Sequence, residues 1–277
     1  MMKKNWFITG ISSGLGKALA DAVIAKGDFL IGSFRKDEQT KLFNDQHQGK
    51  AFAYTLDVRD YKKVEKVIRD IESRIGQIDV LVNNAGYGIL GAIEEVSLDE
   101  VREQMETNFF ATLNITQLVL PLMRKRKSGS IIQMSSGSGI KSTPGFGIYN
   151  ASKFALEGYS EALAAEVKPL GINVMLVEPG PFRTEFLAGS IYVAPKSISD
   201  YEATAGQFKR IMADRNGQQD GDPVKGARAI IQAIESPKPP LRLVLGKLAI
   251  GTVQAKIESL QEDLRNWNEV GMATSFE

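Results

Sequence analysis

The chain has 277 residues, with 34 Lys plus Arg, 33 Asp plus Glu and a formal net charge of +1 at pH 7. This balance argues against a general electrostatic attraction to nucleic acid or to anionic membranes. The chain contains no cysteine, which excludes disulfides, thiol nucleophiles and cysteine metal sites. Its one histidine, His47, stands in a polar stretch without the partners of a metal site or a catalytic triad, so no metal site is predicted.

Neither end of the chain looks like a targeting or membrane segment. A strand pattern begins within a few residues of Met1 and leaves no room for a signal peptide. The most apolar C-terminal run, Leu241 to Val253, is interrupted by Arg242 and Lys247 and is too short to span a bilayer. We therefore expect a cytoplasmic protein without a membrane span.

Apolar strand-like runs alternate with helical patterns along most of the chain. Helical spacing follows the first run at Leu15 and Leu19, and recurs in residues 60–76, 154–167, 224–234 and 257–267. Continuous apolar strands between helices are typical of a parallel sheet that is covered on both faces. The prediction is an α/β fold: a doubly wound parallel sheet (Rossmann fold) with three layers, in a single domain over residues 1–277. The predicted strands are Asn5 to Thr9, Phe29 to Phe34, Ala51 to Leu56, Ile78 to Val82, Ile131 to Met134, Ile172 to Val177 and Leu241 to Leu245.

The alternation lapses between about Glu185 and Asp222. Polar and aromatic residues mix there without a clear period. An insertion of this length in a compact fold is usually a lid or a binding segment. We expect residues 185–222 to form a substrate-binding lid within the single domain.

A glycine-rich turn links the first predicted strand to the first helix. Glycines let a backbone turn sharply and approach a pyrophosphate, whose charge is favoured at a helix N-terminus. The order of strand, turn and helix favours dinucleotide binding over a simple connecting turn. The turn supplies Gly10, Ser12, Ser13, Gly14, Leu15 and Gly16.

Tyr149 and Lys153 stand four residues apart in a run with helical character. Residues at this spacing share one face of a helix, so a phenol and an ammonium would lie side by side. A cation about 4 Å away at an effective dielectric constant of about 20 would favour the phenolate by up to ~4 kcal/mol. That is roughly three pKa units, which predicts a tyrosine that titrates near neutrality and acts as a general acid or base. The spacing alone is weak, because Tyr192 and Lys196 repeat it with Pro195 between them.

The joint pattern resembles the short-chain dehydrogenase/reductase family, in its single-domain branch with Gly-x-x-x-Gly-x-Gly and Tyr-x-x-x-Lys motifs. The resemblance covers about residues 5–184 closely and the rest loosely. Each motif falls in order and at the expected distance, which makes the joint match far more specific than any one of them. The motifs are Gly10, Gly14 and Gly16, then Asn83-Asn84-Ala85-Gly86, Asn108, Ser136, Tyr149 with Lys153, and Pro179-Gly180 with Thr184.

The resemblance implies a catalytic tetrad whose four members are all present. Tyr149 would exchange a proton with the reacting oxygen, and Lys153 would lower the pKa of Tyr149 and hold the nicotinamide ribose. Ser136 would position the reacting oxygen, and the family's spacing selects it over the neighbouring Ser135. Asn108 would hold a proton-relay water; a surface or capping role is its alternative.

The end of the second predicted strand bears on the choice of cofactor. An acidic residue there would bond the ribose 2′-hydroxyl of NAD, whereas a nearby arginine accommodates the 2′-phosphate of NADP. Phe34 occupies the acidic position and Arg35 follows, which favours NADP(H). NAD(H) stays an alternative, because Arg35 can also start a polar loop and the glycine turn supplies no second basic residue.

Further residues are expected at the cofactor through the resemblance. Asp57 and Val58 would meet the adenine, and Thr184 would bond the carboxamide, although a helix cap is its alternative. The remaining expected neighbours of the dinucleotide are Asn83, Ala85, Gly86, Pro179, Gly180 and Phe182.

The sequence thus predicts an oxidoreductase that transfers a hydride between NADP(H) and a carbonyl or secondary alcohol substrate. Its pocket is expected between Ser136, Tyr149, residues 140–146 and residues 186–208, and the apolar lining favours an apolar ketone or alcohol. The resemblance also implies a homodimer or homotetramer. Two alternatives are an epimerase or dehydratase on the same fold and an NADP(H)-sensing regulatory protein without turnover. The expected lining residues are Phe146, Phe182, Phe186, Leu187, Ile191 and Tyr192.

Overall fold

The protein, for which we have a computed structural model that describes residues 3–276, is built on one seven-stranded sheet. The strand order is β3-β2-β1-β4-β6-β7-β9 and every pairing is parallel. The order reverses between β1 and β4, which confirms the predicted doubly wound, Rossmann-like sheet. The strands are β1 (Asn5–Ile8), β2 (Phe29–Phe34), β3 (Ala51–Thr55), β4 (Val80–Asn83), β6 (Gly129–Met134), β7 (Ile172–Pro179) and β9 (Arg242–Leu245).

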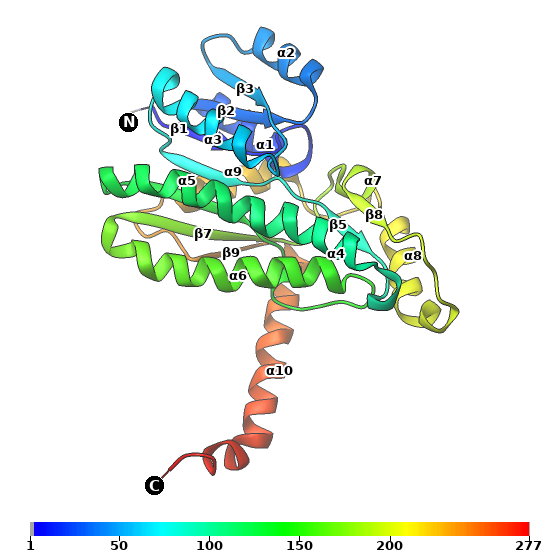
Figure 1. Cartoon of the computed structure of the whole chain (residues 1–277). Helices are drawn as coiled ribbons and strands as arrows, with labels where there is room; N and C mark the ends of the chain where they lie inside the picture. The colour runs from blue at the N-terminus through cyan, green and yellow to red at the C-terminus, as the bar shows by residue number, and fades with distance from the viewer. Residues whose placement is uncertain (1–2, 277) are drawn as a thin grey trace.

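Helices cover both faces of the sheet (Figure 1). One apolar core joins the sheet to α1 and α9, and a second joins the opposite face to α3, α5 and α6. Strand residues such as Phe7, Ile31 and Leu81 are fully buried, which is why these strands read as unbroken apolar runs. The helices are α1 (Gly14–Lys26), α2 (Asp37–Gln46), α3 (Tyr61–Asp70), α4 (Leu98–Met105), α5 (Ala111–Arg126), α6 (Gly147–Val167), α7 (Phe186–Gly189), α8 (Gln207–Asp214), α9 (Pro223–Ile234) and α10 (Lys247–Met272).

Most expected boundaries agree with the structure to within a residue or two. β2 spans Phe29–Phe34 as predicted, whereas β4 starts at Val80 and not at Ile78. The difference arises because the Ile78 N–H donates to the Glu72 carboxylate at 3.0 Å and so does not join the ladder. β7 extends to Pro179, which pairs with Leu245 of β9.

Residues 185–222 contain α7, the short strand β8 (Ile191–Val193) and α8. β8 pairs in parallel with β5 (Gly88–Leu90), outside the main sheet. In Figure 1 this segment lies beside the main sheet, together with β5 and α4.

Helix α10 is longer than the expected helix over residues 257–267. It begins at Lys247, ends at Met272 and projects from the body as a single rod in Figure 1. Every residue from Ile257 to Met272 is exposed. Within residues 3–276, none of the helices combines the length and the apolar character that crossing a bilayer requires.

Candidate active site

The glycine turn is fixed against the end of β4. The side-chain amide of Asn84 donates to the main-chain oxygens of Thr9 and Gly10 at 2.9 and 2.8 Å. Gly10 and Gly14 have φ values of 70° and 64°, which favour glycine. A Cβ at Gly16 would overlap the Asn84 amide and the Gly10 oxygen. The turn therefore depends on its glycines for its shape and on Asn84 for its anchor.

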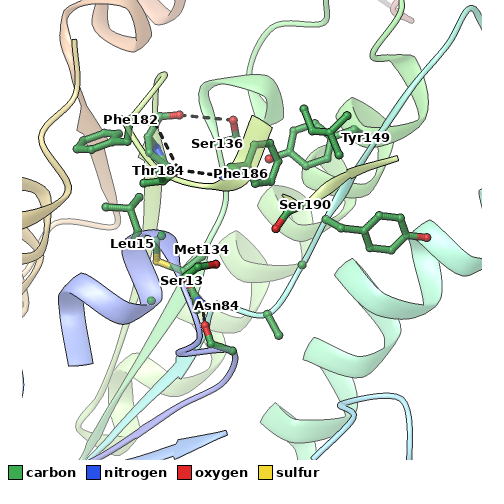
Figure 2. A pocket seen from close by; sticks show the side chains of 18 of the residues that line it. Ser13, Leu15, Asn84, Met134, Ser136, Tyr149, Phe182, Thr184, Phe186 and Ser190 are labelled. Atoms are coloured by element: carbon green, nitrogen blue, oxygen red, sulfur yellow. Dashed lines mark hydrogen bonds between the residues drawn. The ribbon is translucent and has the colours of Figure 1, made fainter. Parts of the chain in front are cut away.

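One cavity of about 1160 Å³ runs from this turn to Tyr149. In Figure 2, Ser13 and Leu15 from the start of α1 lie on one side of it, and Tyr149 lies on the other. Nearly all residues predicted for the cofactor and for catalysis line this single space: Gly10, Ser12, Ser13, Gly14, Leu15, Gly16, Arg35, Asp57, Val58, Ala85, Gly86, Ser136, Tyr149, Lys153, Pro179, Gly180, Phe182 and Thr184.

Asn83 and Asn108 do not line the cavity. Asn83 ends β4 with its amide turned inward, where it donates to Thr116 and Gln133 at 3.0 Å each. Because side chains alternate along a strand, the neighbouring Asn84 reaches the cavity instead. Asn83 was expected to border the dinucleotide. In this structure its side chain lies outside the cavity and binds Thr116 and Gln133 behind the cavity wall.

Basic residues surround the end of β2. The last residue of the strand is the buried Phe34 and not a residue with a carboxylate. Arg35 and Lys36, which follow it, both line the cavity. Asp57 accepts a hydrogen bond from Arg59, which is the largest cause of the lowered pKa of Asp57, and the charge of Arg35 adds to it. Lys36 and Arg59 were missed from the sequence, although Lys36 directly follows Arg35.

Tyr149 lies near the start of α6 and is only 6% exposed. Its ring stacks on Phe146 with 4.4 Å between centroids. Burial raises the pKa of Tyr149 to about 12, although a hydrogen bond with Ser136 acts in the opposite direction. The expectation of a tyrosine that titrates near neutrality is wrong for this structure, because desolvation of the phenolate outweighs its stabilisation.

Lys153 is also buried, and its ammonium donates to the main-chain oxygen of Met134 at 2.7 Å. Its Nζ atom lies 5.7 Å from the centroid of the Tyr149 ring. Desolvation lowers the pKa of Lys153 to about 8, and the carboxylate of Glu157 partly opposes this shift. The two side chains share a helix face as predicted, but the ammonium is directed to the end of β6.

Asn108 occupies a π-helical turn, Glu106–Phe110, and is 2% exposed, so it is not a surface residue. Its side chain donates to the Tyr87 oxygen and to Ser152 at 2.9 and 3.0 Å, and its Oδ1 accepts from the Tyr87 N–H. A Cβ at Gly86 would lie 3.1 Å from this Oδ1 and 3.9 Å from the Lys153 ammonium. Asn108 and Lys153 therefore flank a space that Gly86 keeps free.

Two serines follow β6, and the structure distinguishes them. Ser136 lies beside the Tyr149 phenol, accepts from the Ser138 N–H at 3.1 Å and donates to the Pro179 oxygen at 3.5 Å. Figure 2 shows Ser136, Phe186 and Tyr149 close together. Ser135 lies beside Glu157 and Gly139. Of the two serines, Ser136 is therefore the one that lies beside the Tyr149 hydroxyl.

Thr184 lines the cavity and also makes the hydrogen bonds of a helix cap, which is its alternative role. Its hydroxyl accepts from the Phe186 N–H at 3.3 Å and donates to the Phe182 oxygen at 3.4 Å. This arrangement supports the first turn of α7. Thr184 also approaches Gly14, so it faces the glycine turn.

The end of the cavity next to Tyr149 is largely apolar. Rings of Phe146 and Phe208 lie 5.9 Å apart, and those of Tyr149 and Phe186 lie 6.1 Å apart. All the expected lining residues border the cavity. The first two turns of α10 add Leu248, Ala249 and Thr252, which no sequence pattern indicated.

The cavity suits a nicotinamide dinucleotide. The glycine turn offers open backbone at the N-terminus of α1, and cations stand at the β2 end. The opposite end brings a buried proton donor, a hydroxyl and a cation to one place. Such a site can orient a carbonyl and exchange one proton with it.

Comparison with known proteins identifies relatives of the whole chain. The family model described as short chain dehydrogenase matches residues 4–191. An oxidoreductase of Botryotinia fuckeliana is 36% identical over 99% of this chain and 100% of the relative. A 3-ketodihydrosphingosine reductase of Bacteroides thetaiotaomicron is 40% identical over 87% of each. An NADPH-dependent 3-dehydrocapnine reductase of Ornithobacterium rhinotracheale is 39% identical over 64% of this chain and 65% of the relative.

Solved structures share the fold. A short-chain dehydrogenase from Streptomyces avermitilis superposes with a TM-score of 0.93 at 40% identity, over 99% of this chain and 98% of the other. ElxO with NADP bound superposes with a TM-score of 0.73 at 26% identity, over 88% and 97%.

Proposed function

This chain belongs to the short-chain dehydrogenase/reductase family of oxidoreductases, and we propose that it reduces an apolar carbonyl compound with NADPH. One observation carries the proposal: a single cavity joins Arg35 at the end of β2 to the buried pair Ser136 and Tyr149. The reverse reaction, oxidation of a secondary alcohol with NADP, uses the same groups.

The proton chemistry follows from the surroundings of Tyr149. A bound nicotinamide supplies the hydride to the carbonyl carbon. The Ser136 hydroxyl would hold the carbonyl oxygen, and Tyr149 would donate its proton to that oxygen as charge develops there. A pKa of about 12 keeps Tyr149 protonated at neutral pH, which suits a general acid.

Lys153 and Asn108 would support this transfer. The Lys153 ammonium places a positive charge beneath the ring that becomes a phenolate. Asn108 is locked by bonds to Tyr87 and Ser152, and Ser152 in turn donates to the Tyr149 main-chain oxygen at 2.7 Å. Asn108 would therefore keep the start of α6 in a fixed position relative to the space beside Gly86.

NADPH is proposed over NADH because two cations, Arg35 and Lys36, stand at the β2 end of the cavity, whereas Arg59 there is paired with Asp57 and Glu103. Guanidinium groups suit a 2′-phosphate. A relative named as NADPH-dependent and a structure with NADP bound support the same choice.

The substrate is proposed to be apolar because rings of Phe146, Phe186 and Phe208 surround the reacting end. Residues 185–222 would act as its lid, since α7, β8 and α8 contribute Phe186, Ile191 and Phe208 to the wall. Two relatives named as reductases support the direction of reaction.

The test is NADPH oxidation at neutral pH over aliphatic, aromatic and steroid ketones and aldehydes, with NADH alongside. Tyr149→Phe should abolish turnover and retain NADPH binding. Tyr159→Phe, on the same helix but outside the cavity, is the matched control and should remain active. Binding of NADPH without reduction of any carbonyl would point to the sensing role, and equal turnover with Tyr149→Phe would contradict the assignment of the acid.

A further inference from the structure

Helix α10 carries an apolar stripe that the rest of the described chain leaves largely uncovered. Its members alternate at steps of three and four residues. Leu264 is 70% exposed and Trp267 is 66% exposed, on a helix that projects from the body (Figure 1). We call these residues the α10 seam: Ile250, Val253, Ile257, Leu260, Leu264 and Trp267.

The spacing of the α10 seam is a heptad pattern and not the wider stripe of a helix packed on a globular core. Three consecutive heptads place apolar residues at both the a and the d positions. This period keeps a narrow seam facing one partner helix along its length. An isolated helix gains little stability in water without such packing.

The outer part of α10 does not have the charge of a helix that lies on a membrane. Between Ile250 and Met272 there are two cations, Lys256 and Arg265, and four carboxylates, Glu258, Glu262, Asp263 and Glu269. Interfacial helices are rich in Lys and Arg on the polar face, and anionic headgroups would repel a net negative one. The partner is therefore better sought in another protein helix.

We propose that the α10 seam binds the α10 seam of a second copy of this chain in antiparallel orientation. A two-fold axis that passes between Ile257 and Leu260 matches each a position to a d position. Ile257 then faces the partner's Leu260, and Val253 faces the partner's Leu264. The outermost layer pairs Ile250 with the partner's Trp267, so the largest exposed side chain meets the residue nearest the body.

Charge complementarity selects this orientation. Lys256 and Asp263 both flank the seam at g positions, and in the antiparallel pair each Lys256 lies beside the partner's Asp263. In a parallel pair the same residues would face the partner's Gln261 and the partner's Asn268, which carry no charge. The dipoles of two neighbouring antiparallel helices also attract each other.

The pairing would reach the catalytic cavity through the base of α10. Ala249 is buried against Gly137 and Gly180, and Leu248 and Thr252 line the cavity. Leu248 and Thr252 lie on the side of the helix away from the seam, and Ala249 flanks it. A partner helix that holds the rod in place would therefore also steady this part of the cavity wall.

The first test is the mass of the full chain by analytical ultracentrifugation. The seam variant Ile257→Asp with Leu264→Asp should have half the mass of the wild type at a concentration just above the wild-type dissociation constant, because loss of the α10 contact weakens the assembly even where the body adds a second contact. The matched control, Ser259→Asp with Asn266→Asp, puts the same charges on the face of α10 opposite the seam and should keep the wild-type mass. Equal masses for the wild type and the seam variant would overturn the proposal.

A charge exchange tests the orientation without removing the seam. Lys256→Asp and Asp263→Lys should each weaken the assembly about tenfold or more, because like charges then face each other twice. The double exchange should restore the dissociation constant to within about threefold of the wild type. If the losses of affinity in the two single variants simply added in the double variant, the antiparallel pairing would be excluded.

Distance measurement supplies an independent check, since the chain has no cysteine of its own. A spin label on Glu269→Cys should give a separation of ~32 Å along the axis in the antiparallel pair, whereas parallel helices would bring the labels within roughly one helix diameter. The last experiment measures binding to lipid vesicles by flotation. Vesicle binding by a chain whose mass is unaffected by the seam variant would assign the seam to a lipid surface and overturn the proposal.

Discussion

The ammonium of Lys153 donates a 2.7 Å hydrogen bond to the main-chain oxygen of Met134, at the carboxyl end of β6. This bond fixes the cation in the wall of the cavity, 5.7 Å from the ring centroid of Tyr149. In the proposed reaction Lys153 would therefore contribute its charge, and not a short contact with the phenol.

Reduction is expected to lose rate above about pH 8. The pKa of Lys153 is lowered to about 8 by burial, so the ammonium is present below that pH and is lost above it. Tyr149 stays protonated over the same range, because its pKa is raised to about 12. The pH profile of kcat/KM for NADPH-dependent reduction should show this fall in the wild type. Lys153→Arg, which stays charged, should lack it.

Lys153→Met should lower kcat about 10²–10⁴-fold below pH 8, since no cation then supports the phenolate, and the difference from the wild type should shrink above pH 8, where the wild type loses its own ammonium. NADPH binding, followed by cofactor fluorescence, separates this effect from loss of the cofactor site. A fall above pH 8 that persists in Lys153→Arg would assign the titration to another group.

Glu178→Gln should remove a pH dependence of stability. Glu178 is fully buried, and Arg242 Nε lies 3.4 Å from its Oε1 and 3.1 Å from Oε2 of Glu157. Burial raises the pKa of Glu178 from 4.5 to about 7, and the charge of Glu157 adds to the shift. The folded state thus holds a proton that the unfolded state has released, and the free energy of unfolding falls as pH rises through this window.

Urea unfolding at pH 5 and pH 8 measures this effect. The wild type should lose ~1–3 kcal/mol more than Glu178→Gln over that range. Glu161→Gln, at a largely exposed partner of the same Arg242, is the control and should behave like the wild type. An unchanged pH slope in Glu178→Gln would show that Glu178 is ionised throughout.

Gly16→Ala should damage the glycine turn, because the added methyl would overlap the Asn84 amide and the Gly10 oxygen. We expect NADPH affinity to fall at least about tenfold and stability to fall by ~1–3 kcal/mol. Gly158→Ala makes the same change in α6, where a Cβ meets nothing within 4 Å. It should stabilise the helix by ~0.5–1 kcal/mol. Isothermal titration and thermal unfolding of both variants compare the two sites.

Arg35→Ser should shift the cofactor preference. Loss of a charge-assisted bond to the 2′-phosphate costs ~1.5–3 kcal/mol, so KM for NADPH should rise about tenfold or more, while KM for NADH changes little. Lys36→Ser tests the neighbouring cation, which also lines the cavity. Equal effects of Arg35→Ser on both cofactors would place Arg35 away from the 2′ position.

Local chemistry explains what could be predicted for the fold. The unbroken apolar runs, the helical spacing over residues 60–76 and the glycine turn before α1 each depend on neighbouring residues, so β2 and the doubly wound sheet could be predicted. The position of Arg35 after β2 followed for the same reason. The full length of α10 did not, because Gly246 directly precedes it, Gly251 lies in its second turn, and its first residues belong to an apolar run that resembles a strand.

The sequence by itself determined the fold class and many of the residues gathered at the cavity, because both follow from periodicity and from motif order along the chain. The tertiary structure decided the electrostatics. Glu157, Glu178 and Arg242 are far apart in sequence and meet only after β7 and β9 pair. The raised pKa of Tyr149, the lowered pKa of Lys153 and the choice of Asn84 over Asn83 all depend on burial, which is a property of the packed molecule.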